Sequence, residues 1–156
     1  MKKILLTIGI LMSFCSVIYA ATEADALTFF KNYVKLANNY SDDVTKLYAP
    51  NAKIIRQVIK PDGTTADAIT NSATYVKQLK IGQAGAKLRG YKNSYSNVKV
   101  QKINDNKFKI SSVRQPIGDN DKLKTYMIIQ KQSNGNWLIV EELMQTRQQI
   151  FLRYVK

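Results

Sequence analysis

Two adjacent carboxylates, Glu141 and Glu142, stand in a run of large apolar residues near the end of the chain, NGNWLIVEELMQTRQQ (134–149). A carboxyl group in an apolar cavity has a raised pKa and can act as a general acid or base. Because side chains alternate along a strand, we expect one of the two to face the interior and the other to face solvent or a surface lysine. The alternative is that both form ordinary ion pairs at a strand end. The sequence leaves open which of the two faces inward.

Arg56 is a second candidate, because in the segment IIRQV it shares a strand face with Ile54 and Val58. A guanidinium group on such an apolar face needs a buried partner, and Glu141 or Glu142 could supply it. Such a pair would be either a structural contact or the anion-binding end of a pocket.

Aromatic residues could complete a pocket, since a tyrosine packs its ring against apolar groups and keeps a polar hydroxyl at the edge. We expect Tyr33, Tyr48, Tyr126 and Trp137 to contact a ligand together with Arg56. For each tyrosine the alternative is plain core packing.

Lysines at 99, 107 and 109 alternate with apolar residues, which predicts a positive stripe of Lys99, Lys107 and Lys109 on the exposed face of a sheet. The chain carries a net charge of +13, concentrated in residues 77–131. Such a surface attracts an anionic membrane or an acidic protein, although it could equally serve solubility alone. No aromatic RNA-binding signature accompanies the charge, so we do not expect a nucleic-acid partner.

The composition excludes several kinds of catalytic site. The chain has no histidine, and its single cysteine, Cys15, lies near the N-terminus. Thiol nucleophiles, Cys/His zinc sites and Ser-His-Asp triads are therefore excluded from the remainder of the chain. We expect no metal and no cofactor.

The N-terminus has the layout of a secretory signal peptide. Lys2 and Lys3 precede an apolar stretch, ILLTIGILMSFCSVI (4–18), and small residues follow it. Cleavage after Ala20 would leave residues 21–156 as one domain, exported to the periplasm or the cell exterior.

Hydrophobic periodicity then predicts the elements. We expect a helix over 22–40 capped by Thr22, a short helix after Ser41, and a strand from Ala52. A PDG turn (61–63) leads to a returning strand, and a third helix is capped by one of residues 70–72. Four strands separated by hairpin-type turns complete the chain, and we expect them to be antiparallel neighbours.

This order of elements, the phrase LYAPNAKII (47–55) and the closing NGNWLIVEE (134–142) resemble the nuclear transport factor 2-like superfamily, also called ketosteroid-isomerase-like or SnoaL-like. The resemblance implies an α+β fold, in which a cone-shaped curved antiparallel sheet wraps around N-terminal helices and leaves a pocket open at one end. In isomerase-like relatives a tyrosine on the first helix donates to an oxyanion while a strand carboxylate moves the proton. Tyr33 matches that tyrosine, but the first strand offers Arg56 and Gln57 where the acid would stand.

The sequence therefore favours an exported, non-catalytic binding domain. It would hold a small apolar or lipid-like ligand in the cone, or dock an anionic partner on its basic sheet. One alternative is a cofactor-free isomerase, dehydratase or hydrolase that uses Glu141 or Glu142 with Tyr33 or Arg56. Another is an assembly domain of an envelope complex or an inhibitor of a toxin. A homodimer is compatible with each of these functions.

Overall fold

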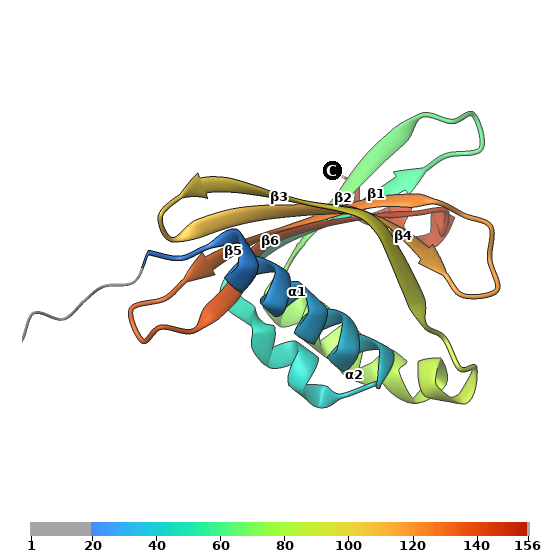
Figure 1. Ribbon diagram of the computed structural model, residues 1–156. Helices are drawn as coiled ribbons and strands as arrows, with labels where there is room; N and C mark the ends of the chain where they lie inside the picture. The colour runs from blue at the N-terminus through green and yellow to red at the C-terminus, as the bar shows by residue number, and fades with distance from the viewer. Residues whose placement is uncertain (1–19, 156) are drawn as a thin grey trace, which may run out of the picture.

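The computed structural model describes residues 20–155, so most of the predicted signal peptide (1–20) lies outside the described residues. The domain is α+β, as predicted, with one curved sheet and its two long helices on the same face (Figure 1). The helices are α1 (Glu23–Asn38) and α2 (Ser72–Leu88), and two short 3-10 helices are η1 (Asp42–Leu47) and η2 (Gln149–Tyr154). The strands are β1 (Tyr48–Ile59), β2 (Thr65–Asn71), β3 (Asn93–Asn104), β4 (Lys107–Pro116), β5 (Leu123–Lys131) and β6 (Trp137–Thr146).

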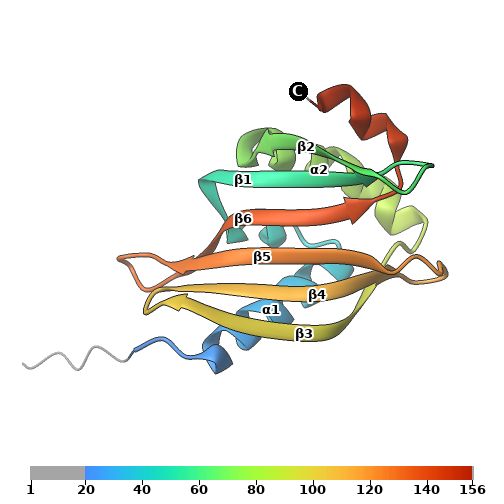
Figure 2. The same ribbon diagram turned by 90° about the horizontal axis from the view of Figure 1, so that it is seen from above.

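The sheet order is β2-β1-β6-β5-β4-β3, which Figure 2 shows with the helices behind the sheet. Strands joined by a hairpin pair antiparallel, as predicted, but β1 and β6 pair in parallel, so the sheet is mixed. The reason is the long connection through α2, which carries the chain from the β2 edge to the opposite edge. Three consecutive hairpins then return it to β1, where β6 arrives in the same direction as the first strand.

Local sequence signals set the ends of the helices. The Thr22 hydroxyl accepts a hydrogen bond from the Asp25 amide at 3.2 Å, and the Asp25 carboxylate accepts one from the Thr22 amide at 2.8 Å. This reciprocal capping box satisfies two of the amides that every helix start leaves free. Asn71 caps α2 by accepting from the Thr74 amide. The first strand begins at Tyr48, earlier than the sequence predicts, and runs through Pro50 beside an irregularity in its pairing with β6.

A β-bulge at Val140 corrects the expected faces of the last strand. On β5, the adjacent residues Ile128 and Ile129 pair with Glu141 and Ile139, so Val140 is an extra residue between them. Strict alternation would put Ile139 and Glu141 on one face. The bulge instead lets Ile139 and Glu142 both face the helices, each at most 1% exposed, while Glu141 faces outward. Bulges also increase strand twist, which bends the sheet around the helices.

The core lies between α1 and the inner face of the sheet. Its fully buried side chains include Ile54, Phe108, Ile110, Ile129 and Ile139. Phe108 and Trp137 pack with ring centroids 5.7 Å apart. Helices of the described region are too short or too polar to cross a lipid bilayer.

Candidate functional site

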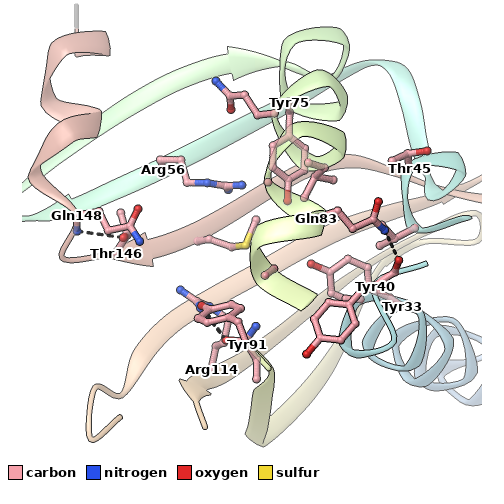
Figure 3. Close-up of a pocket in the computed structure, with 18 of the residues that line it drawn as sticks. Tyr33, Tyr40, Thr45, Arg56, Tyr75, Gln83, Tyr91, Arg114, Thr146 and Gln148 are labelled. Carbon is pink, nitrogen blue, oxygen red and sulfur yellow. Dashed lines mark hydrogen bonds between the residues drawn. The ribbon is translucent and has the colours of Figure 1, made fainter. Parts of the chain in front are cut away.

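A half-enclosed cavity of about 510 Å³ lies between the helices and the sheet (Figure 3). Six tyrosines line it: Tyr33, Tyr40, Tyr48, Tyr75, Tyr91 and Tyr95. Arg56, Arg89 and Arg114 also line it, and among the residues that the structure describes no carboxylate does. Aromatic walls with a few polar groups are typical of small-molecule pockets, and this size suits one such molecule.

Glu142 anchors two of these tyrosines from behind the cavity wall. The Tyr33 hydroxyl donates to its Oε1 at 3.0 Å, and the Tyr48 hydroxyl donates to its Oε2 at 2.8 Å. Tyr33 comes from α1, Tyr48 begins β1 and Glu142 lies on β6, so three elements are joined through one carboxylate. Because both hydroxyl protons point at Glu142, the tyrosines offer oxygen lone pairs, rather than protons, to the cavity.

Burial sets the ionisation of this group of residues. Desolvation raises the pKa of Glu142, against the lowering effects of the Arg56 charge and of the two tyrosine hydrogen bonds. Desolvation, followed by repulsion from Glu142, raises the pKa values of Tyr33 and Tyr48 well above the ordinary range. Both tyrosines therefore stay neutral and are poor proton donors to a substrate.

The raised pKa of Glu142 predicts a pH-dependent stability. Between its unfolded and folded pKa values the folded state binds the extra proton, so the free energy of unfolding falls as pH rises through this window. This contribution is fully present below the unfolded value, near 4.5. We expect the wild type to lose stability relative to Glu142→Gln from about pH 4.5 upward, because glutamine does not ionise. Urea unfolding of both proteins at several pH values measures the difference, and parallel pH profiles would contradict it.

Arg56 reaches the cavity from the inner face of β1. Its guanidinium lies 4.5 Å from the centroid of the Tyr75 ring, a cation–π contact with α2. Its Nη1 is buried without a hydrogen-bond partner. Of the four ion pairs that join described residues, none links Arg56 to Glu141 or Glu142. Arg56 therefore interacts with Glu142 through its charge and not through an ion-pair contact, and its Nη1 remains without an acceptor among the described residues.

Arg114 is a second cavity arginine, which the sequence analysis missed. It is 8% exposed and donates to the Tyr91 hydroxyl, the Asn93 side-chain oxygen and the Gln145 carbonyl at 2.8–3.1 Å. All three acceptors are neutral, so the Arg114 charge has no ion-pair partner among them. A signal was present, because the alternation that puts Phe108 and Ile110 inside continues to residue 114 on the same face.

Tyr40 lines the cavity in a strained backbone conformation. Its φ is +56°, in the left-handed region that bulky residues rarely adopt. Its hydroxyl is buried without a hydrogen-bond partner, and its carbonyl accepts from the Gln83 side chain of α2. Strained residues of this kind often cluster at ligand sites, where surrounding contacts hold them in place.

Glu141 and Tyr126 lie on the outer face of the sheet, away from the cavity. The Tyr126 hydroxyl donates to Glu141 at 2.6 Å, and the Lys53 ammonium lies 3.9 Å from the same carboxylate. The expectation that Tyr126 lines the cone pocket is therefore wrong. The alternation of β5 directs its neighbours Thr125 and Met127 inward and Tyr126 outward.

The three lysines lie on this same outer face. Lys99 is exposed, whereas Lys107 and Lys109 are half-buried. The Lys109 ammonium packs over the Tyr126 ring, 4.3 Å from its centroid. The three lysines thus share the outer face of the sheet with the carboxylate of Glu141, so the positive charge of this face is reduced.

Trp137 does not line the tyrosine cavity either, contrary to the expectation. It lies near the other end of the sheet, beside Phe108 and a more open depression of about 500 Å³ bordered by Phe29 and Leu47. The last strand runs from Trp137 at this end to Met144 and Thr146 at the cavity, so one strand serves both ends.

The groups that face the cavity define its chemistry. They are phenol hydroxyls, guanidinium groups, side-chain amides such as Gln78, and apolar surface such as Leu79 and Met144. Within residues 20–155, no group of three or more His, Cys, Asp or Glu side chains is placed to hold a metal ion. The lining suits recognition of a small molecule through hydrogen bonds, aromatic packing and positive charge.

No protein-family model matches the sequence, and no curated protein matches it significantly. Solved structures do share its fold. Yeast UBP3-associated protein BRE5 aligns with a TM-score of 0.59 at 17% identity, covering 80% of this chain and 95% of that one. An NTF-2-like protein of unknown function from Shewanella oneidensis MR-1 gives 0.57 at 11% identity, covering 80% and 98%. A candidate scytalone dehydratase from Novosphingobium aromaticivorans gives 0.52 at 16% identity, covering 78% and 82%.

These similarities confirm the predicted nuclear transport factor 2-like fold. The proteins that share it include one associated with another protein and one named for an enzyme activity. At such low identity the likeness extends to the fold and not to a function.

Proposed function

We propose that this nuclear transport factor 2-like domain is an exported binding protein that holds one small amphipathic molecule in the tyrosine-lined cavity. The observation that carries the proposal is the 510 Å³ cavity, whose wall combines aromatic rings with hydroxyl and guanidinium groups. A well-packed core needs no space of this size, because protein interiors have few voids larger than a water molecule. The unpartnered Tyr40 hydroxyl adds a polar group that a ligand could satisfy.

The arrangement of Glu142 favours binding over acid–base catalysis. An enzyme of the isomerase type needs a carboxylate that reaches the substrate and a tyrosine that donates to it. Here Glu142 does not line the cavity, and Tyr33 and Tyr48 direct their protons to Glu142. The carboxylate is better placed to hold the cavity wall than to move a proton on a ligand.

Native mass spectrometry of the protein, purified from the cells that naturally produce it, tests the proposal. We expect an additional mass of one small molecule on the folded protein. Ala86→Trp should abolish it, because Ala86 lines the cavity and the indole would occupy the ligand volume. The matched control is Ala84→Trp on the exposed face of the same helix, which should retain the ligand.

Two results would overturn the binding function. One is a wild-type protein that carries no small molecule even after incubation with a metabolite extract of those cells. The other is equal retention by Ala86→Trp and Ala84→Trp, since the ligand would then lie elsewhere. The same spectra give the mass of the mature chain and so report whether residues 1–20 are removed.

A further inference from the structure

We infer that the cavity selects a small organic carboxylate with an aromatic body, an inference that rests on the proposed binding function and names its ligand class. The first observation is the charge of the lining. Arg56, Arg89 and Arg114 contribute three positive charges to the cavity wall, and within residues 20–155 no carboxylate lines it. Glu142, behind the wall, interacts with the charges of Arg56 and Arg114, and one carboxylate balances at most one of the three positive charges.

The second observation is the hydrogen bonding of the two inner arginines. Arg114 uses its two terminal nitrogens on neutral acceptors, so these bonds orient the guanidinium without neutralising it. Arg56 is oriented by the Tyr75 ring, which also leaves its charge in place. Figure 3 shows both arginines among the cavity-lining side chains. A charged donor held in a low-dielectric wall attracts an anion strongly, since little solvent screens it.

The third observation concerns the body of the ligand. The same cavity presents the rings of six tyrosines, and one of them, Tyr95, packs edge to face against Phe30, which does not line the cavity. Aromatic rings prefer stacked or edge-to-face contacts with another ring, which adds to the area that they bury. A planar aromatic carboxylate therefore matches both parts of the site. Its carboxylate accepts hydrogen bonds from Arg56 and is also attracted by the nearby charge of Arg114. Its ring packs among the tyrosines.

The roles of the two arginines differ in this arrangement. Arg56 is half-buried and lines the cavity, so it is the direct contact to the carboxylate. Arg114 is 8% exposed and held by three hydrogen bonds, so it contributes mainly through its charge. Removing Arg56 should therefore weaken binding more than removing Arg114.

Isothermal titration calorimetry with a matched pair of probes tests this ligand class. The probes are naphthalene-2-carboxylate and naphthalene-2-carboxamide, which differ in charge but hardly in shape. We expect the carboxylate to bind the wild type about 10- to 100-fold more tightly than the amide, which is the range expected for a charged hydrogen bond. Arg56→Met should remove most of this preference and leave amide binding nearly unchanged.

Three variants complete the design. Arg153→Met is the matched control, because it removes the same charge from η2 at a residue that does not line the cavity, and it should bind both probes as the wild type does. Arg114→Lys keeps the charge and should retain the preference for carboxylate. Arg114→Met, which removes the charge, should weaken carboxylate binding less than Arg56→Met does. If Arg114→Met does not fold, Arg114→Lys still tests this position. Circular dichroism melts accompany each variant.

The outcomes separate this inference from the proposed function. Equal affinity for the two probes, with both lost in Ala86→Trp, would overturn the carboxylate class and leave the binding function intact. Equal behaviour of Arg56→Met and Arg153→Met would overturn the role of the cavity arginines. Absence of binding by either probe at millimolar concentration would also overturn the stated class, whereas the binding function itself is judged by the native mass spectra.

Discussion

Replacing Glu142 with alanine is expected to lower the free energy of unfolding by about 3–5 kcal/mol, the order expected for two buried hydrogen bonds to a carboxylate. The substitution leaves the Tyr33 and Tyr48 hydroxyls buried without their acceptor and opens a void beside them. It also separates three elements that meet at this carboxylate. Guanidinium unfolding followed by far-ultraviolet circular dichroism measures the loss.

The adjacent glutamate is the natural control. Glu141→Ala removes the same side chain from the outer face, where this side chain is 27% exposed, and should cost less than about 1 kcal/mol. Adding Tyr33→Phe and Tyr48→Phe to Glu142→Ala should recover part of the lost stability, because the unpaired hydroxyls are then gone. Similar losses for Glu141→Ala and Glu142→Ala would contradict the assignment of Glu142 as the buried anchor.

A second large effect is expected from Phe108→Ala at the packed end of the core. Phe108 is fully buried against Trp137, so its removal should cost about 3–5 kcal/mol through lost contacts and a residual cavity. Because Phe108 does not line the tyrosine cavity, the retained ligand should still be present in native mass spectra recorded well below the lowered melting temperature. Denaturant unfolding and native mass spectrometry of the same sample give both readouts.

Ile103→Ala serves as the control for this change. Ile103 is on edge strand β3 and is 48% exposed, so its truncation should alter stability by less than about 0.5 kcal/mol. If Phe108→Ala lost its ligand while remaining folded, the two ends of the cone would not be energetically separate, and binding would depend on the whole core.

Much of the fold follows from short-range signals in the sequence. Thr22 and Asp25 give the reciprocal cap at the first helix, and the period-two pattern from Lys107 onward gives β4 with its inner and outer faces. The parallel pairing of β1 with β6 is different in kind. It depends on the connection through α2, which places β3 at the far edge of the sheet. The sequences of β1 and β6 themselves do not indicate this connection.

The site was predictable only in part, for a related reason. Strict alternation on the last strand fails at Val140, because a bulge is a property of two paired strands and not of one sequence. This is why the inward choice between Glu141 and Glu142 stayed open. The inward position of Arg114, in contrast, could have been predicted from the same alternation that places Phe108 inside. The position of Tyr40 in the cavity could not have been predicted in this way, since it depends on a left-handed backbone and on a contact from α2.

The position of β6 also has a consequence for the time at which the domain can fold. The final strand is inserted between β1 and β5, and Ile54 near the start of the domain pairs with Glu142 near its end. Until the last strand has been synthesised, the sheet remains in two pieces and Tyr48 lacks its acceptor. Contacts between such distant segments also slow folding, because a long loop must close before they form.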